Sequence, residues 1–281
     1  MQELEAYLSR AKHLPLAPRV LPELLALLRS DEVDADRVVT VIAYDPSLTA
    51  AVLQLCNSAF YSPATPVGDI PRAITWLGFK QVYQLVTTAV GARLLDGDQK
   101  GYGIGKGELW RHSVAAAVAA RILARRQGDD ENLAFTAALL HDLGKIVLSE
   151  ALEPVYDRLV EETEHGQRSL LAAEKLLLGV HHAELGGQLL TRWRFPEPVI
   201  NAVWYHHQPR EAHPHERLAA TVYLGNLIAH VLGHSHAHEV LVVSDCAESL
   251  QLLELGPESV PALMTETLEG LDAVSQMFGS L

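Results

Sequence analysis

Apolar residues recur every three or four positions along most of this chain, which is the spacing of helices that bury one face. Leu48, Val52 and Leu55 show this spacing, and they follow Asp45-Pro46, a pair typical of a helix start. Strand-like alternation is hard to find. The pattern therefore predicts an all-α protein. Helices are expected within 18–29, twice within 34–60, and within 69–77, 79–95, 108–127, 131–148, 150–164, 168–178, 182–193, 196–207, 215–232 and 257–278.

One stretch interrupts the helical pattern. The segment 97-GDQKGYGIGKG-107 holds five glycines in eleven residues and separates two helical blocks. A phosphate-binding loop is the weaker interpretation, because no strand precedes the glycines and no Gly-Lys-Ser/Thr follows them. We therefore expect two lobes that meet near 97–107: an N-terminal helical lobe of residues 1–100 and a second helical lobe of residues 101–281.

Composition and charge narrow the class of protein. The 281 residues are 48% hydrophobic and 20% charged, which is too apolar for a disordered chain. The net charge of −13 disfavours binding to nucleic-acid backbones or anionic membranes. Two cysteines provide no disulfide framework, and no apolar run approaches the roughly 18 residues of a membrane span. A cytoplasmic protein is expected.

The candidate chemistry lies in the histidines of the second half. Glu108 and His112 are four residues apart on one helix face, and His141-Asp142 ends an apolar helix. Imidazole and carboxylate together suit Fe, Mn, Zn, Co or Ni, and a shared aspartate can bridge two ions. A further cluster, 230-HVLGHSHAH-238, is interpreted as a solvated helix end, with surface metal binding as the alternative. The remaining members of the candidate set are His182, His206, His207 and Asn226.

The order of these groups resembles the HD superfamily of metal-dependent phosphohydrolases. Within it, 141-HDLGK-145 is similar to the motif of HD-GYP cyclic-dinucleotide phosphodiesterases. The whole chain, over about residues 8–278, most resembles the HDOD domain, the HD-related output domain of bacterial signalling proteins. This resemblance rests on 14-LPLAPRVLPELLALL-28, 44-YDPSLTAAVLQLCNSAFYSP-63, 67-VGDIPRAITWLGFKQVYQL-85, 110-WRHSVAAAVAARILA-124 and 182-HAELGGQLLTRWRFPEPVINAVWYHHQP-209.

The resemblance implies an all-α, two-lobed fold, with residues 101–281 as an HD-like helical lobe that includes the closing C-terminal helices, and a set of metal ligands. In an active member, Asp142 and Lys145 would be the catalytic residues, with Lys145 near the substrate phosphate. Asn226 stands where the HD pattern has its closing aspartate, and a neutral amide is a poorer ligand. Gln208-Pro209 replaces the GYP signature, which argues against a standard cyclic di-GMP phosphodiesterase. The ligand positions are matched by Glu108, His112, His141, Asp142, His182, His206 and His207, with Asn226 as a weak eighth.

Three functions are compatible with this set. We favour a bacterial signalling protein that keeps an HD-type metal site and acts mainly through other signalling proteins. The alternative is a metal-dependent phosphohydrolase or phosphodiesterase acting on a nucleotide or another phosphoester. A nucleotide sensor without turnover is the third. One or two transition metal ions are expected, Fe or Mn first, with Zn, Ni and Co as alternatives, and Asn226→Asp is expected to raise metal occupancy.

Overall fold

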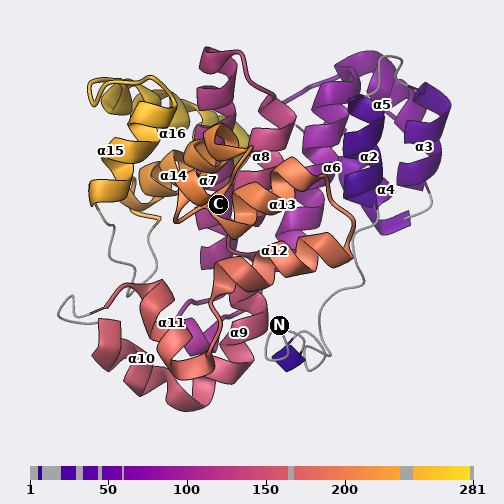
Figure 1. Ribbon diagram of the computed structural model, residues 1–281. Coiled ribbons are helices and arrows are strands. Elements are labelled where there is room, and N and C mark those ends of the chain that lie inside the picture. The colour runs from indigo at the N-terminus through magenta and orange to yellow at the C-terminus, as the bar shows by residue number, and fades with distance from the viewer. Residues whose placement is uncertain are drawn as a thin grey trace.

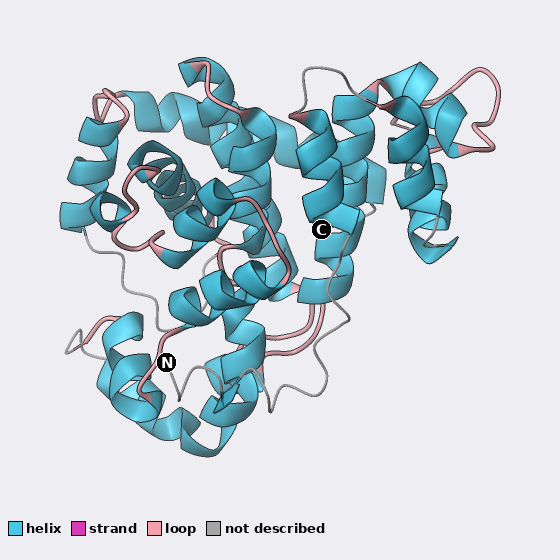
Figure 2. Cartoon of the chain, turned by 45° about the vertical axis from the view of Figure 1, so that its right-hand side comes forward, coloured by secondary structure: helices cyan, strands magenta, loops and turns pink. Residues whose placement is uncertain are grey.

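The computed structural model describes residues 6–7, 20–29, 34–43, 46–58, 60–163, 168–234 and 243–278. Within these ranges the chain is helical, and the only extended pairing is an isolated bridge between Gln99 and Ile104. The predicted all-α class is therefore confirmed (Figure 2).

The N-terminal helices lie together on one side of the molecule (Figure 1). Their polar boundaries follow local rules: Asp69 caps α5 by accepting a hydrogen bond from the backbone N–H of Arg72, and proline stands in the first turn. The elements are α2 (Val20–Leu28), α3 (Ala35–Ala43), α4 (Pro46–Cys56), α5 (Ile70–Leu77) and α6 (Phe79–Leu95).

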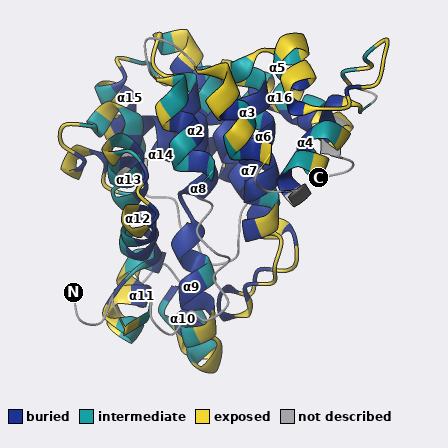
Figure 3. Ribbon diagram, turned by 90° about the vertical axis from the view of Figure 1, so that its right-hand side faces the viewer, coloured by how far each residue is buried: buried dark blue, intermediate teal, exposed yellow. Residues whose placement is uncertain are grey.

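The second half is built around α7, which packs against α8, α14 and α16. Nearly every residue of α8 is buried, and the helices through the middle of the molecule are mostly dark blue in Figure 3. The helices are α7 (Glu108–Gln127), α8 (Glu131–Leu140), α9 (Leu143–Leu152), α10 (Tyr156–Thr163), α11 (Leu170–Leu178), α12 (His182–Arg192), α13 (Glu197–Trp204), α14 (Glu216–Val231), α15 (Val243–Leu252) and α16 (Ser259–Phe278). Short 3₁₀ turns lie at η1 (Lys100–Tyr102), η2 (Glu153–Val155) and η4 (Pro209–Glu211).

Two helix predictions differ from the structure. The stretch 131–148 is not one helix: it breaks at His141-Asp142, where Asp142 leaves helical geometry and α9 begins at Leu143. Periodicity alone did not reveal this break because both halves are apolar. In addition, α15 at Val243–Leu252 was not expected.

The glycine-rich segment packs closely on the second half. A Cβ on Gly101 would lie 2.8 Å from the Cβ of Leu152 and 2.9 Å from the backbone nitrogen of Glu153, and closer still to the carbonyl oxygen of Ser149. Glycine is therefore required for this close approach to α9. The segment is thus fixed against α9 and brings Tyr102 into the interior, where it is 2% exposed.

Among the described residues, no single helix is long and apolar enough to cross a membrane. Only α3 together with Leu48–Cys56 reaches that length and hydropathy, and this pair is bent by 114°.

Candidate metal centre

The break between α8 and α9 places His141 and Asp142 at the centre of a buried polar cluster. His141 is 0% exposed and Asp142 is 1% exposed. Because His141 ends α8 and Asp142 precedes α9, adjacent side chains can reach the same space, which residues 100° apart on one continuous helix could not easily do.

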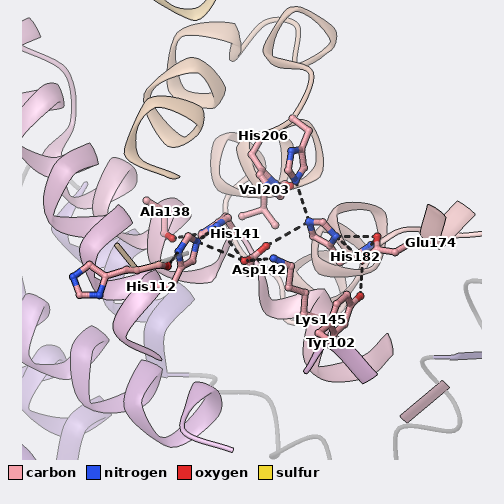
Figure 4. A network of polar contacts seen from close by, with 12 residues as sticks. Tyr102, His112, Ala138, His141, Asp142, Lys145, Glu174, His182, Val203 and His206 are labelled. Atoms are coloured by element: carbon pink, nitrogen blue, oxygen red, sulfur yellow. Dashed lines mark hydrogen bonds and ion pairs between the residues drawn. The ribbon is translucent and has the colours of Figure 1, made fainter. Parts of the chain in front are cut away.

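Imidazoles from other helices surround the Asp142 carboxylate (Figure 4). Its Oδ2 lies 3.4 Å from Nε2 of His141 and 3.7 Å from Nε2 of His112 on α7. Its Oδ1 lies 3.4 Å from Nε2 of His182, at the start of α12. The carboxylate therefore stands between two groups of imidazoles, as a bridging ligand would.

Two sets of possible ligand atoms result. His112, His141 and Asp142 form one, and His182, His206 and His207 form the other; within each set the ligand atoms lie within 4.8 Å of one another. Six of the residues expected from the sequence thus come together from four separate parts of the chain.

The outer nitrogens of four rings are fixed by acceptors. Nδ1 of His112 donates to the carbonyl oxygen of His234, and Nδ1 of His182 donates to the Glu174 carboxylate. Nδ1 of His141 and of His206 each donate, at 2.7 Å, to the carbonyl three residues earlier, on Ala138 and Val203. Because a backbone carbonyl can only accept, Nδ1 of His112, His141 and His206 holds a proton, and these rings, when neutral, present Nε2 lone pairs to the centre.

This arrangement leaves nitrogen lone pairs directed at one another. Nε2 of His112 and Nε2 of His141 lie 3.3 Å apart. Nε2 of His206 is fully buried and has no hydrogen-bond partner among the described residues. Buried acceptors of this kind are costly unless a proton or a cation lies between them. The residues present therefore fit a transition metal ion, which imidazole and carboxylate ligands favour.

Burial and neighbouring charges set the protonation of these rings. Burial, with the nearby rings of His207 and His141, holds the pKa of His206 well below its usual value. Burial also opposes protonation of His182, but the Glu174 carboxylate outweighs it and raises the pKa of His182.

Lys145 completes the centre. It is fully buried, and its ammonium Nζ lies 2.7 Å from Oδ2 of Asp142 and 6.0 Å from the centre of the Tyr102 ring. This ion pair offsets part of the cost of burying both side chains.

Sequence reasoning missed Glu174 and Tyr102. Glu174 is 0% exposed and accepts from the backbone N–H and from Nδ1 of His182. Tyr102 donates to the same carboxylate at 2.6 Å. The available signals were weak: a lone carboxylate within the apolar helix 170-LLAAEKLLL-178, and an aromatic residue among glycines.

Other candidates lie outside the two ligand sets. Glu108 is exposed, and its carboxylate accepts from the backbone N–H of Gly105 at 2.7 Å. Asn226 is buried on α14, and its Oδ1 has no hydrogen-bond partner among the described residues. His181, the neighbour of His182, instead caps α12 by accepting from the N–H of Glu184.

The histidine cluster at 230–238 needs a correction. His230 is not on a solvated helix end: it is 7% exposed, and its ring centre lies 4.8 Å from that of His112. A solvated end was expected because the cluster follows the last apolar residues of α14, but the antiparallel packing of α14 on α7 buries this turn. His236 and His238 lie outside the described residues.

Comparison with known proteins supports the architecture. The model of the HDOD domain matches residues 14–209, more than half of the chain. The chain belongs to the HDOD family. Its solved relatives include an HDOD domain protein of unknown function from Geobacter sulfurreducens, 25% identical, with a TM-score of 0.71 over 96% of this chain and 88% of that one.

Two further relatives are similar over most of this chain. A candidate phosphohydrolase from Shewanella amazonensis SB2B is 25% identical, with a TM-score of 0.70 over 97% of this chain and 96% of that chain. An uncharacterized protein of Treponema pallidum is 27% identical over 82% of this chain. The present chain spans only 45% of the length of that relative.

Replacing Glu174 with glutamine should weaken metal binding at the His182 set by about 10- to 100-fold, because partners of metal-binding histidines contribute on this scale. The amide offers fewer acceptor positions to the three donors that Glu174 now serves and carries no charge to orient the ring. Chelator competition measures the change. Tyr102→Phe removes only one of these hydrogen bonds and should have the smaller effect; equal affinity in wild type and Glu174→Gln would contradict the assigned role.

Proposed function

We propose that this HDOD chain is a metal-binding regulatory module whose output is contact with other signalling proteins. The observation that supports this is the burial of all but one of the groups at the centre, since only His207 is partly exposed. His112, His141, Lys145, His182 and His206 are 0% exposed and Asp142 is 1% exposed. A phosphoester undergoing metal-assisted hydrolysis must place a phosphoryl oxygen among these groups. All of these side chains except His207 are closed to solvent, whereas binding an ion requires no such access for a substrate.

In this proposal the ion acts by joining helices. The ligand sets draw on α7, the α8–α9 junction, α12 and the end of α13, which are distant in sequence. Metal binding to the folded form alone stabilises it and orders the elements that supply ligands. Fe and Mn are the first ions to test, with Zn, Ni and Co as alternatives. The surfaces of α12 and α13 would then differ between metal-loaded and metal-free protein. A partner protein could therefore bind one of these forms in preference to the other.

A metal-dependent phosphohydrolase is the second candidate, with a nucleotide or another phosphoester as substrate. The position of Asp142 between the two ligand sets favours it, as does the intact 141-HDLGK-145 motif. Bound ions would supply positive charge to polarise a phosphoryl oxygen. Lys145 would have to exchange its ion pair with Asp142 for a contact to the phosphoryl group.

One set of measurements separates the two functions. Purified wild type and Asp142→Asn are loaded with Mn²⁺ or Fe²⁺, and metal per chain, hydrogen exchange and hydrolysis of a phosphoester panel are recorded. We expect at least one ion per wild-type chain, added protection at the ends of α8 and α13, and no hydrolysis. The amount of signalling protein that the chain captures should differ between wild type and Asp142→Asn.

Two results would count against the regulatory module. Wild type that binds no ion in excess metal would reject the metal centre itself. Hydrolysis by metal-loaded wild type that is lost in Asp142→Asn would establish the phosphohydrolase instead.

A further inference from the structure

One buried histidine beside the centre has no role in the ligand sets described above. His230 lies on the last turn of α14, and its ring faces that of His112 at an interplanar angle of 56°. The His112 ring in turn lies 5.2 Å from that of His141. His230 is 7% exposed, and its ring centre lies 4.8 Å from that of His112, a member of the first ligand set.

The packing of α14 on α7 fixes which residue of α14 lies opposite His112. A Cβ on Gly225 would lie 2.6 Å from the carbonyl oxygen of Ala116 and 3.2 Å from the Cβ of Ala120. His230 lies beside His112. Residue numbers therefore increase along α14 in the direction in which they decrease along α7, so the two helices are antiparallel.

This register separates Asn226 from the level of His112. Asn226 directly follows Gly225, at the level of Ala116, which is about one helical turn, or ~6 Å, from His112. His230 is one turn further along α14 and is level with His112. The residue of α14 that faces the first ligand set is therefore His230.

We infer that His230 is a ligand of the ion held by His112, His141 and Asp142, and that it makes this site selective for imidazole-preferring metals. The inference rests on the proposed metal centre and deepens it. An imidazole here would take the place of a negatively charged ligand, leaving Asp142 as the single carboxylate in either ligand set. The charge of Asp142 is itself partly balanced by Lys145.

The chemistry of such a set differs from that of a carboxylate-rich site. Imidazole suits Zn²⁺, Ni²⁺ and Co²⁺, whereas carboxylate and water suit Mn²⁺, and the general affinity order already places Mn²⁺ lowest. A first site with three imidazoles and one carboxylate should therefore have a higher Co²⁺/Mn²⁺ affinity ratio than a site in which a second carboxylate takes the place of His230.

The test compares Co²⁺ and Mn²⁺ affinities in wild type and four variants by chelator competition, with the visible spectrum of Co²⁺ and the electron spin resonance of Mn²⁺ as direct signals. His230→Asp should lower the Co²⁺/Mn²⁺ affinity ratio by at least about tenfold, because it exchanges an imidazole for a carboxylate. His230→Leu should weaken Co²⁺ binding at one site by at least about tenfold and change its spectrum.

Two controls match the charge change. His215→Asp places a carboxylate at the other end of α14, remote from the centre, and should leave the ratio unchanged. Asn226→Asp places it one turn from His230 and should change the ratio less than His230→Asp does. Circular dichroism of each metal-free variant establishes that it folds; if His230→Asp does not fold, His230→Leu decides.

The outcomes distinguish loss of the metal centre from loss of the role of His230. Wild type that binds neither ion would reject the proposed metal centre. Wild type that binds both ions, with unchanged Co²⁺ affinity and spectrum in His230→Leu, would overturn the role of His230. A shift in the ratio with Asn226→Asp but not with His230→Asp would assign the position to Asn226 instead.

Discussion

Alanine at position 144 should destabilise the fold by about 4 kcal/mol and disrupt the metal centre, which is a large effect for one added methyl group. A Cβ there would lie 2.7 Å from the carbonyl carbon of His182 and 2.9 Å from the backbone nitrogen of Gly186, and closer still to the His182 carbonyl oxygen. All three are backbone atoms of α12, so no side-chain rotation can relieve the overlap. The helices α9 and α12 would have to separate, which would move His182 away from Asp142.

Denaturant unfolding of the metal-free protein measures the loss of stability. Metal titration of the same samples measures the disruption of the metal centre. Gly68→Ala is a matched control, because a Cβ on Gly68 would meet no atom within 4 Å. A Gly144→Ala protein with wild-type stability and metal content would show that α9 and α12 do not approach as closely as described.

Asp142→Asn should abolish binding of both ions and also destabilise the metal-free protein by about 3–5 kcal/mol. The carboxylate serves both ligand sets through its two oxygens, so the first effect follows from geometry. The second arises because the Lys145 ammonium, 0% exposed, would lose the carboxylate 2.7 Å away. Metal per chain and the free energy of unfolding without metal are the two measurements.

A double variant separates the two causes. Asp142→Asn with Lys145→Met removes both charges and should recover much of the stability that Asp142→Asn loses, since an apolar pair often replaces a buried ion pair at little cost. It should still bind no metal. If the double variant were as unstable as Asp142→Asn alone, the lost stability would come from something other than the buried ammonium.

Most of the helices could be predicted from the sequence, because each buries a regular apolar face. Local signals such as Asp69 before Ile70–Leu77 also define their starts. The HD motif and the separated histidines were sufficient to name six residues that the structure brings together. The break at His141-Asp142 could not be found by periodicity, since apolar residues continue on both sides of it.

Contacts that depend on tertiary register were beyond prediction. Glu174 meets Tyr102 across 72 positions of sequence, and neither residue belongs to the recognised motif. The resemblance to the HD pattern places its closing aspartate within 219–229, at Asn226. The choice between Asn226 and His230 depends on how α14 lies along α7, and only the close approach of Gly225 to Ala116 fixes that register.

The anchoring of Tyr102 has a thermodynamic consequence for the whole chain. The glycine-rich segment joins the N-terminal helices to the centre, and Tyr102 connects it to the carboxylate that orients His182. Free energies of linked equilibria are reciprocal. Suppose that an ion at His182 strengthens the hydrogen bond between Glu174 and Tyr102. A protein that binds the N-terminal helices and, through this segment, weakens that hydrogen bond must then lower the affinity for the ion by the same factor. Metal affinity would thus report on events at the opposite end of the molecule, without any contact between the two ligands.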